Sequence, residues 1–209
     1  ICKPIEHGAA IVIHSLTKYI GGHGTAIAGS IVDSGNFDWT ADPKRQPLFN
    51  KPDASYSGAI WGKVVPELTG ANIPFAVRAR VCLLRDLGSA CSPDNAFAII
   101  QGLETVPLRK KQHCENAQKV VEYLKKHKEV TKVIYSTEHE KNIADRAKKY
   151  LNGGNGPMIG IELKGGIEAG KRFIESLKMF YHVANIGDAR SLAIHPASTT
   201  HSQLNEKEL

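Results

Sequence analysis

The chain has 209 residues, of which 42% are hydrophobic, and its formal net charge is +6. This length suffices for one large domain or two small ones, each with a buried core. Basic and acidic residues are interspersed, and the densest basic run, residues 107–130, has the pattern of a solvated helix face, which disfavours a nucleic-acid partner.

The four cysteines form neither a CxxC pair nor a set with zinc-ligand spacing. They are Cys2, Cys82, Cys91 and Cys114. Isolated cysteines of this kind are typical of reduced thiols in cytosolic proteins. The sequence also has no apolar run long enough for a membrane helix and no recognisable signal peptide. We therefore expect a soluble cytoplasmic protein with no membrane partner.

The first part of the chain predicts two strands followed by a loop-rich segment. Residues 9–15, AAIVIHS, form a short β-branched apolar run that predicts a buried parallel strand. Residues 25–35 alternate small and branched apolar side chains and predict the next strand. Residues 36–71 are rich in Pro, Gly, Asp and Tyr and predict loops with short helical pieces.

Three helices are predicted next. Apolar spacing predicts the first over residues 72–90, with Asn72 as its N-cap. The serine and proline at 92–93 predict the start of a second helix, which should end near Gly102. A third helix is expected from about residue 107 to residue 127. Its predicted inner side consists of Leu108, Ala117, Val120, Val121 and Leu124.

Strands and helices alternate beyond the third helix. The predicted strands are 130–136, 158–165, 182–187 and 191–196, and the predicted helices are 142–151 and 167–180, with a further helix beginning at Ser202. Such alternation after a long helix indicates a second, smaller α/β domain. We therefore assign residues 1–105 to a large domain and residues 106–209 to a small one.

The most informative segment is VIHSLTKYIGGHG, residues 12–24, in which Lys18 follows the hydroxyls of Ser15 and Thr17. Hydroxyls and loop amides form compact phosphate sites, but here the lysine precedes the glycines, which is the reverse of a P-loop. A lysine amine can condense with a carbonyl, and pyridoxal phosphate (PLP) carries an aldehyde and a phosphate on one ring. The spacing alone leaves two interpretations open, a cofactor lysine beside phosphate-binding hydroxyls and an ordinary turn lysine.

The wider context resembles the Cys/Met-metabolism family of PLP-dependent enzymes. Residues 5–35 resemble the lysine region of that family, and residues 182–209, with their HPASTTH core, resemble its substrate-side segment. The sequence IGGHGT, residues 79–109 and the sequence ANIGDARSL resemble the O-acetylhomoserine sulfhydrylase branch. The resemblance implies an α/β PLP-dependent transferase of fold type I. The chain would hold the end of its large cofactor domain and most of its small C-terminal domain.

The resemblance also implies roles for individual residues. Lys18 matches the lysine that holds the cofactor covalently and later moves protons, and Ser15 and Thr17 match the phosphate-binding hydroxyls. Asn185 matches a residue near the substrate carboxylate, although its residue type alone favours a turn role. No metal is expected, because the histidines of the HPASTTH segment lack a third ligand at metal-binding spacing.

The implied reaction is a γ-replacement, in which sulfide or a thiol displaces the acetate of O-acetyl-L-homoserine to give homocysteine or methionine. The alternatives are a γ-lyase or a cystathionine synthase of the same family, and an inactive fragment that pairs with a partner chain. The family resemblance also implies a homo-oligomer, namely a homotetramer. Further residues of the family site are expected before Ile1 and after Leu209, so we expect both ends to be cuts through a longer polypeptide and the 209 residues alone to lack activity.

Overall fold

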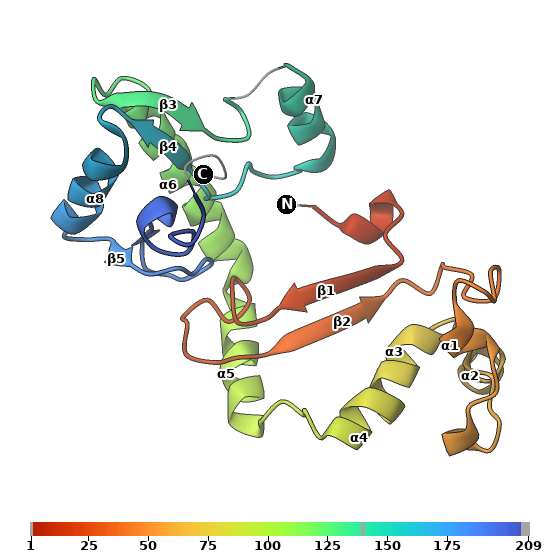
Figure 1. The fold of residues 1–209 in the computed structure, drawn as a ribbon. Helices are drawn as coiled ribbons and strands as arrows, with labels where there is room; N and C mark the ends of the chain where they lie inside the picture. The colour runs from red at the N-terminus through yellow and green to blue at the C-terminus, as the bar shows by residue number, and fades with distance from the viewer. Residues whose placement is uncertain (1, 139–140, 206–209) are drawn as a thin grey trace. The chain divides into compact units, whose positions relative to one another are not determined.

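The computed structural model (Figure 1) describes residues 2–138 and 141–205. The chain divides into two compact units. We call residues 3–15 and 28–96 the strand unit. We call residues 16–27 and 97–209, together with the first two residues, the lysine unit. Lys18 and Asn185 therefore belong to the same unit, although they are far apart in the sequence.

The strand unit begins with a 3-10 turn, Pro4–His7, followed by the antiparallel pair β1 (Ile11–Ser15) and β2 (Gly29–Asp33). The prediction of a buried parallel strand at residues 9–15 was wrong in two respects. The strand is antiparallel to its described neighbour, and the Ile13 side chain is 72% exposed. A parallel neighbour requires a crossover, usually helical, whereas residues 16–28 contain no helix and return the chain directly.

The remaining named elements of the strand unit are helical. Its helices are α1 (Pro47–Asn50), α2 (Trp61–Thr69), α3 (Pro74–Arg78) and α4 (Arg85–Leu87), with a 3-10 turn at Ala54–Tyr56 and a π-helical turn at Ala79–Leu84. Phe49, Trp61, Val65 and Cys82 form the buried core of this unit. The indole of Trp61 donates to Asp53 Oδ2 at 2.9 Å, so this polar group is satisfied where the ring is buried.

The helix predicted over residues 72–90 exists, but its start was assigned wrongly. Pro74 occupies the first helical position, which makes Ile73 the N-cap residue. Asn72 lies one residue too early to cap the helix. Its side-chain amide instead donates to the carbonyl oxygen of Phe37 at 2.7 Å.

The second and third predicted helices are α5 (Pro93–Glu104) and α6 (Val106–Leu124). Ser92 is confirmed as the N-cap of α5, because its Oγ accepts from Asn95 N at 3.2 Å. Along α6, the buried positions are Ala117 and Val121, which form a core with Tyr135.

Two of the predicted inner residues of α6 are exposed, Leu108 at 71% and Val120 at 38%. An α-helix turns by about 100° per residue, so Leu108 lies on the side opposite Ala117. Val120 lies at the edge of the stripe that Ala117 and Val121 share. The apolar side chains of α6 are thus not confined to one face. A count of its apolar residues therefore overestimates how many of them are buried.

Beyond α6, the lysine unit contains the antiparallel pair β3 (Val130–Ile134) and β4 (Gly160–Leu163), the helices α7 (Lys141–Tyr150) and α8 (Gly166–Ser176), and a 3-10 turn at Pro196–Ser198. Of the last two predicted strands, 182–187 overlaps β5 (Tyr181–His182) only at His182, and 191–196 is reduced to β6 (Leu192–Ala193), which pairs with β5 in parallel. Residues 202–205 are not helical, and the remainder of the helix predicted from Ser202 lies outside the described residues. No helix within the described ranges is long and apolar enough to cross a membrane.

The core of the lysine unit can be tested at two adjacent valines of α6. Val121 is fully buried and Val120 is partly exposed. Val121→Ala should lower the free energy of unfolding by about 1.5–3 kcal/mol, because it removes buried methyl groups and leaves a cavity. Val120→Ala should change it by less than about 0.5 kcal/mol. Urea unfolding followed by circular dichroism measures both, and equal losses would contradict this assignment of the core.

Candidate functional site

Lys18 lies in the turn-rich segment that follows β1. Its Nζ donates a hydrogen bond to Oδ1 of Asn185, a residue 167 positions later in the sequence. Both side chains are half-buried. Within the described part of the chain, no carboxylate forms an ion pair with the Lys18 amine. The structure thus joins the two residues that the sequence assigned to the cofactor and to the substrate.

The loop carrying Asn185 packs directly on the backbone of residues 16–24, which we call the lysine segment. Gly187 has a positive φ of 77°, and a Cβ atom there would lie 2.5 Å from Tyr19 N and 2.8 Å from the carbonyl carbon of Lys18. Ala189 N donates to the Gly22 carbonyl oxygen at 2.8 Å. Only glycine at 187 allows this approach, which brings the loop that carries Asn185 against Lys18.

Asp188 holds this loop in shape, and sequence analysis did not identify it. The residue is only 6% exposed, and its carboxylate accepts from Arg190 N, Nε and Nη2 at 2.8, 3.1 and 2.9 Å. The hydrogen bonds from the Arg190 side chain keep the pKa of Asp188 below its ordinary value. A glycine followed by Asp and, two residues later, Arg could have indicated such a side-chain-to-backbone turn.

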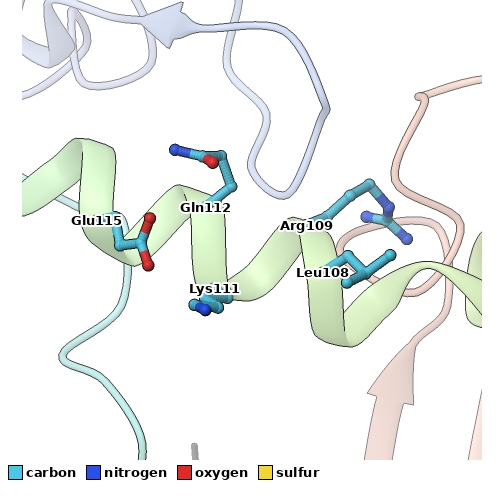
Figure 2. Close-up of a pocket in the computed structure, with 5 residues that line it drawn as sticks. All are labelled: Leu108, Arg109, Lys111, Gln112 and Glu115. Carbon is cyan, nitrogen blue, oxygen red and sulfur yellow. The ribbon is translucent and has the colours of Figure 1, made fainter.

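A second residue that sequence analysis missed is Arg109, in the first turn of α6. Its Nη1 donates to the Tyr19 carbonyl oxygen at 2.8 Å, and its Nη2 donates to the Ile20 and Gly102 carbonyl oxygens at 3.1 and 2.6 Å. Its Nε donates to Thr105 Oγ1 at 3.0 Å. Figure 2 shows this side chain leaving α6 towards the lysine segment, at one end of a hollow lined by Leu108, Arg109, Lys111, Gln112 and Glu115.

Glycines let the lysine segment and the adjoining helices meet backbone to backbone. A Cβ atom on Gly102 of α5 would collide with the Gly21 carbonyl oxygen and would lie 2.6 Å from that of Ile20. A Cβ atom on Gly22 would collide with the Arg109 guanidinium. The lysine segment therefore leaves no room for a side chain at either position.

The ring of Tyr19, the residue after Lys18, lies against α6. Lys110 Nζ is 3.8 Å from the centre of this ring, and His113 meets it edge-on with ring centres 6.4 Å apart. Burial raises the pKa of Tyr19 and lowers the pKa of Lys110. Burial, followed by the charges of Lys110 and Arg109, lowers the pKa of His113, so the neutral imidazole is favoured.

The two candidate phosphate ligands fall in different units. Thr17 is half-buried in the lysine unit beside Lys18, whereas Ser15 is the last residue of β1 and is exposed. Their role toward a phosphate stays a prediction.

His195 is hydrogen-bonded to Ser198 Oγ at 2.7 Å. Among residues 2–138 and 141–205, no three His, Cys, Asp or Glu side chains are grouped as metal ligands.

Comparison with known proteins identifies a family and several relatives. The model of the Cys/Met metabolism PLP-dependent enzyme family matches residues 1–209. The chain is 49% identical to O-acetyl-L-homoserine sulfhydrylase of Leptospira meyeri, with 100% of this chain and 48% of the relative covered. It is 46% identical to O-acetyl-L-homoserine sulfhydrylase 1 of Thermus thermophilus, with 100% and 48% covered. The chain spans about half the length of the curated relatives it matches.

A solved structure is also similar. The crystal structure of a putative O-acetylhomoserine (thiol)-lyase from Campylobacter jejuni has a TM-score of 0.86 and 36% identity, with 100% of this chain and 48% of that chain covered. That structure contains N'-pyridoxyl-lysine-5'-monophosphate. The similarity therefore extends from the sequence to the arrangement of the backbone.

The residues around Lys18 fit a cofactor with an aldehyde and a phosphate. The described structure holds the amine on a neutral amide oxygen, so condensation with an aldehyde would break no ion pair. The Thr17 hydroxyl adjoins it in the sequence and is of the type that binds phosphate oxygens. The donor set thus suits PLP, and Lys18, Thr17 and Asn185 are the residues of the lysine unit that would hold the cofactor and its substrate.

The close packing at Gly102 predicts that alanine there lowers the free energy of unfolding, whereas helix propensity alone predicts that alanine raises it. Alanine normally stabilises a helix interior relative to glycine by about 0.5–1 kcal/mol. Here the added methyl group would meet carbonyl oxygens of the lysine segment. Gly102→Ala should therefore lower the free energy of unfolding by about 1–3 kcal/mol and increase tryptic cleavage after Lys18.

Gly29→Ala is the matched control, because a Cβ atom there would meet only the His14 carbonyl oxygen at 3.5 Å. Urea unfolding and mass spectrometry of limited digests measure the two effects. Unchanged stability and unchanged cleavage after Lys18 in Gly102→Ala would contradict the packing described here.

Proposed function

Because the chain belongs to the Cys/Met metabolism family of PLP-dependent enzymes, we propose that it forms part of an O-acetylhomoserine sulfhydrylase. The reaction would exchange the acetate of O-acetyl-L-homoserine for sulfide or a thiol, giving homocysteine or methionine. The observation that carries this proposal is the hydrogen bond from Lys18 Nζ to Asn185 Oδ1, which joins a candidate cofactor residue to a candidate substrate residue. The names of the Leptospira and Thermus relatives support the choice of reaction.

Lys18 has two tasks in the proposed reaction. Its amine would attach the cofactor covalently, and after release it would remove and return protons at Cα and Cβ of the substrate. PLP, when bound, supplies the electron sink that stabilises the negative charge left on the substrate. The half-buried setting of Lys18 would limit the access of water to the amine.

Asn185 can serve Lys18 and the substrate at once. A side-chain amide has one acceptor oxygen and two N–H donors. In the described structure the oxygen accepts from Lys18, which leaves the Nδ2 donors for a substrate carboxylate. Asn185 would therefore orient the amine with one atom and the amino-acid substrate with the other.

The remaining assignments are proposals of the same kind. Ser15 and Thr17 would donate to the cofactor phosphate, because hydrogen bonds to an anion are stronger than those between neutral groups. Residues 1–105 would complete the large domain of a fold-type-I enzyme, and residues 106–209 would form most of its small domain. The family resemblance further suggests a homotetramer.

The reaction is tested with the complete polypeptide that carries these residues. We expect homocysteine and acetate to form from O-acetyl-L-homoserine only when sulfide is supplied, and methionine to form with methanethiol. Release of 2-oxobutyrate at the same rate without any thiol would indicate a γ-lyase. Cystathionine formation with cysteine as the preferred acceptor would indicate a cystathionine synthase. No turnover of a correctly folded protein would favour the inactive partner chain.

The covalent role of Lys18 is tested separately by borohydride reduction and peptide mapping. Reduction of the cofactor-loaded protein should leave the pyridoxyl label on Lys18, and Lys18→Ala should abolish that label. Lys63, an exposed lysine of α2 in the strand unit, provides the control. Lys63→Ala should leave the labelling unchanged, whereas a label found on Lys63 or on another lysine would overturn the assignment.

A further inference from the structure

The lysine segment is held in place chiefly through its main-chain carbonyl groups. Two of these bonds are internal, from Gly21 N to the Leu16 carbonyl oxygen and from Gly22 N to the Lys18 carbonyl oxygen, both at 2.7 Å. They close a tight turn around Lys18. The carbonyl groups of Tyr19 and Ile20 point outside this turn and require a donor from elsewhere, because partly buried backbone groups seldom remain unpaired.

Arg109 supplies the donors for both carbonyl groups. Its guanidinium donates from Nη1 to Tyr19 and from Nη2 to Ile20, so one planar group binds two consecutive peptide units. A lysine ammonium is a point charge and cannot present such a fork in a fixed plane. These carbonyl groups belong to the second and third peptide units after Lys18, so binding them restrains the backbone from which the Lys18 side chain projects.

The stability of α6 as a helix does not explain why an arginine occupies position 109. Arg109 is the fourth residue of α6, in the first turn, where the helix dipole opposes a positive charge. The contacts to Tyr19, Ile20 and Gly102 offset this opposition, since charge-assisted hydrogen bonds are stronger than neutral ones. The position of the guanidinium is therefore explained by the carbonyl groups that it binds.

We propose that Arg109 is a positioning residue for Lys18, a role that rests on the proposed function. By binding the Tyr19 and Ile20 carbonyl groups, Arg109 keeps the amine directed at Asn185 and ready to form the covalent bond to the cofactor. Arg109 itself touches neither Lys18 Nζ nor Asn185 in the described structure. Loss of the fork should therefore misdirect the amine without removing any chemical group from the site.

A purely structural role for Arg109 is the competing explanation. The same side chain also joins the end of α5 to the start of α6 through Gly102 and Thr105. Thr105→Val removes the acceptor of the Nε bond and leaves the two bonds to the lysine segment. It therefore tests the Thr105 part of the helix junction separately from the role at Lys18, and the bond to the Gly102 carbonyl oxygen is kept. Lys111→Met is a charge control on an exposed part of the same helix.

The experiment compares the complete wild-type polypeptide with Arg109→Met, Thr105→Val and Lys111→Met. Hydrogen exchange of the cofactor-free proteins reports on residues 16–24, and borohydride trapping with peptide mapping reports the rate at which pyridoxal phosphate labels Lys18. We expect Arg109→Met to exchange faster in residues 16–24 and to label Lys18 about ten- to a hundredfold more slowly, as a misplaced reacting group does. The label should spread to other lysines, and both control variants should resemble the wild type.

Each outcome decides between the explanations. If the wild type is labelled at Lys18 and Arg109→Met is labelled there at the same rate, the positioning role alone is overturned. A wild-type label elsewhere would overturn the positioning role together with the proposed function. Equal slowing in Thr105→Val would assign the effect to the helix junction and overturn the role at Lys18. If Arg109→Met does not fold, Arg109→Lys, which keeps the charge without the fork, replaces it in the same comparison and should also slow labelling.

Discussion

The site depends on one constraint, namely that the turn bearing Lys18 packs through its backbone rather than through side chains. Its carbonyl groups bind Arg109 on one side, and its Gly22 carbonyl group binds Ala189 N on another. Backbone hydrogen bonds are directional and of fixed reach, so the turn can occupy only a narrow range of positions. Gly102 and Gly187 make this contact possible because neither residue places a Cβ atom between its own segment and the turn that bears Lys18.

This arrangement explains how a mobile side chain can be aimed. A lysine has a long flexible stem, and holding it in one direction costs about 1.5–2 kcal/mol of side-chain entropy. In the lysine unit the stem starts from a fixed backbone and ends on the Asn185 oxygen, so both ends are constrained. The Asp188–Arg190 pair in turn fixes the shape of the loop that carries Asn185. The backbone at Lys18 and the loop of Asn185 are thus each oriented by hydrogen bonds that lie outside the reacting groups.

Much of the fold could be predicted from local patterns, and the errors have identifiable causes. The β-branched run at residues 11–15 indicated a strand, but strand direction depends on the connection that follows, which here contains no helix. Ser92 was identified as a cap because capping involves residues only three positions apart. Leu108 was placed in the core because it is apolar, although its angular position on α6 puts it on the exposed side.

By itself, the sequence determined most of the succession of helices and strands, the family and the candidate cofactor residues Ser15, Thr17 and Lys18. These features are encoded within short windows, where spacing and residue type dictate backbone conformation and chemistry. Only the tertiary structure decided that Lys18 meets Asn185 across 167 positions and that Arg109 binds the Tyr19 carbonyl group across 90. Contacts at such separations depend on how the helices and loops pack. Every residue has a main-chain carbonyl group, so the residue type does not reveal which carbonyl group accepts a hydrogen bond.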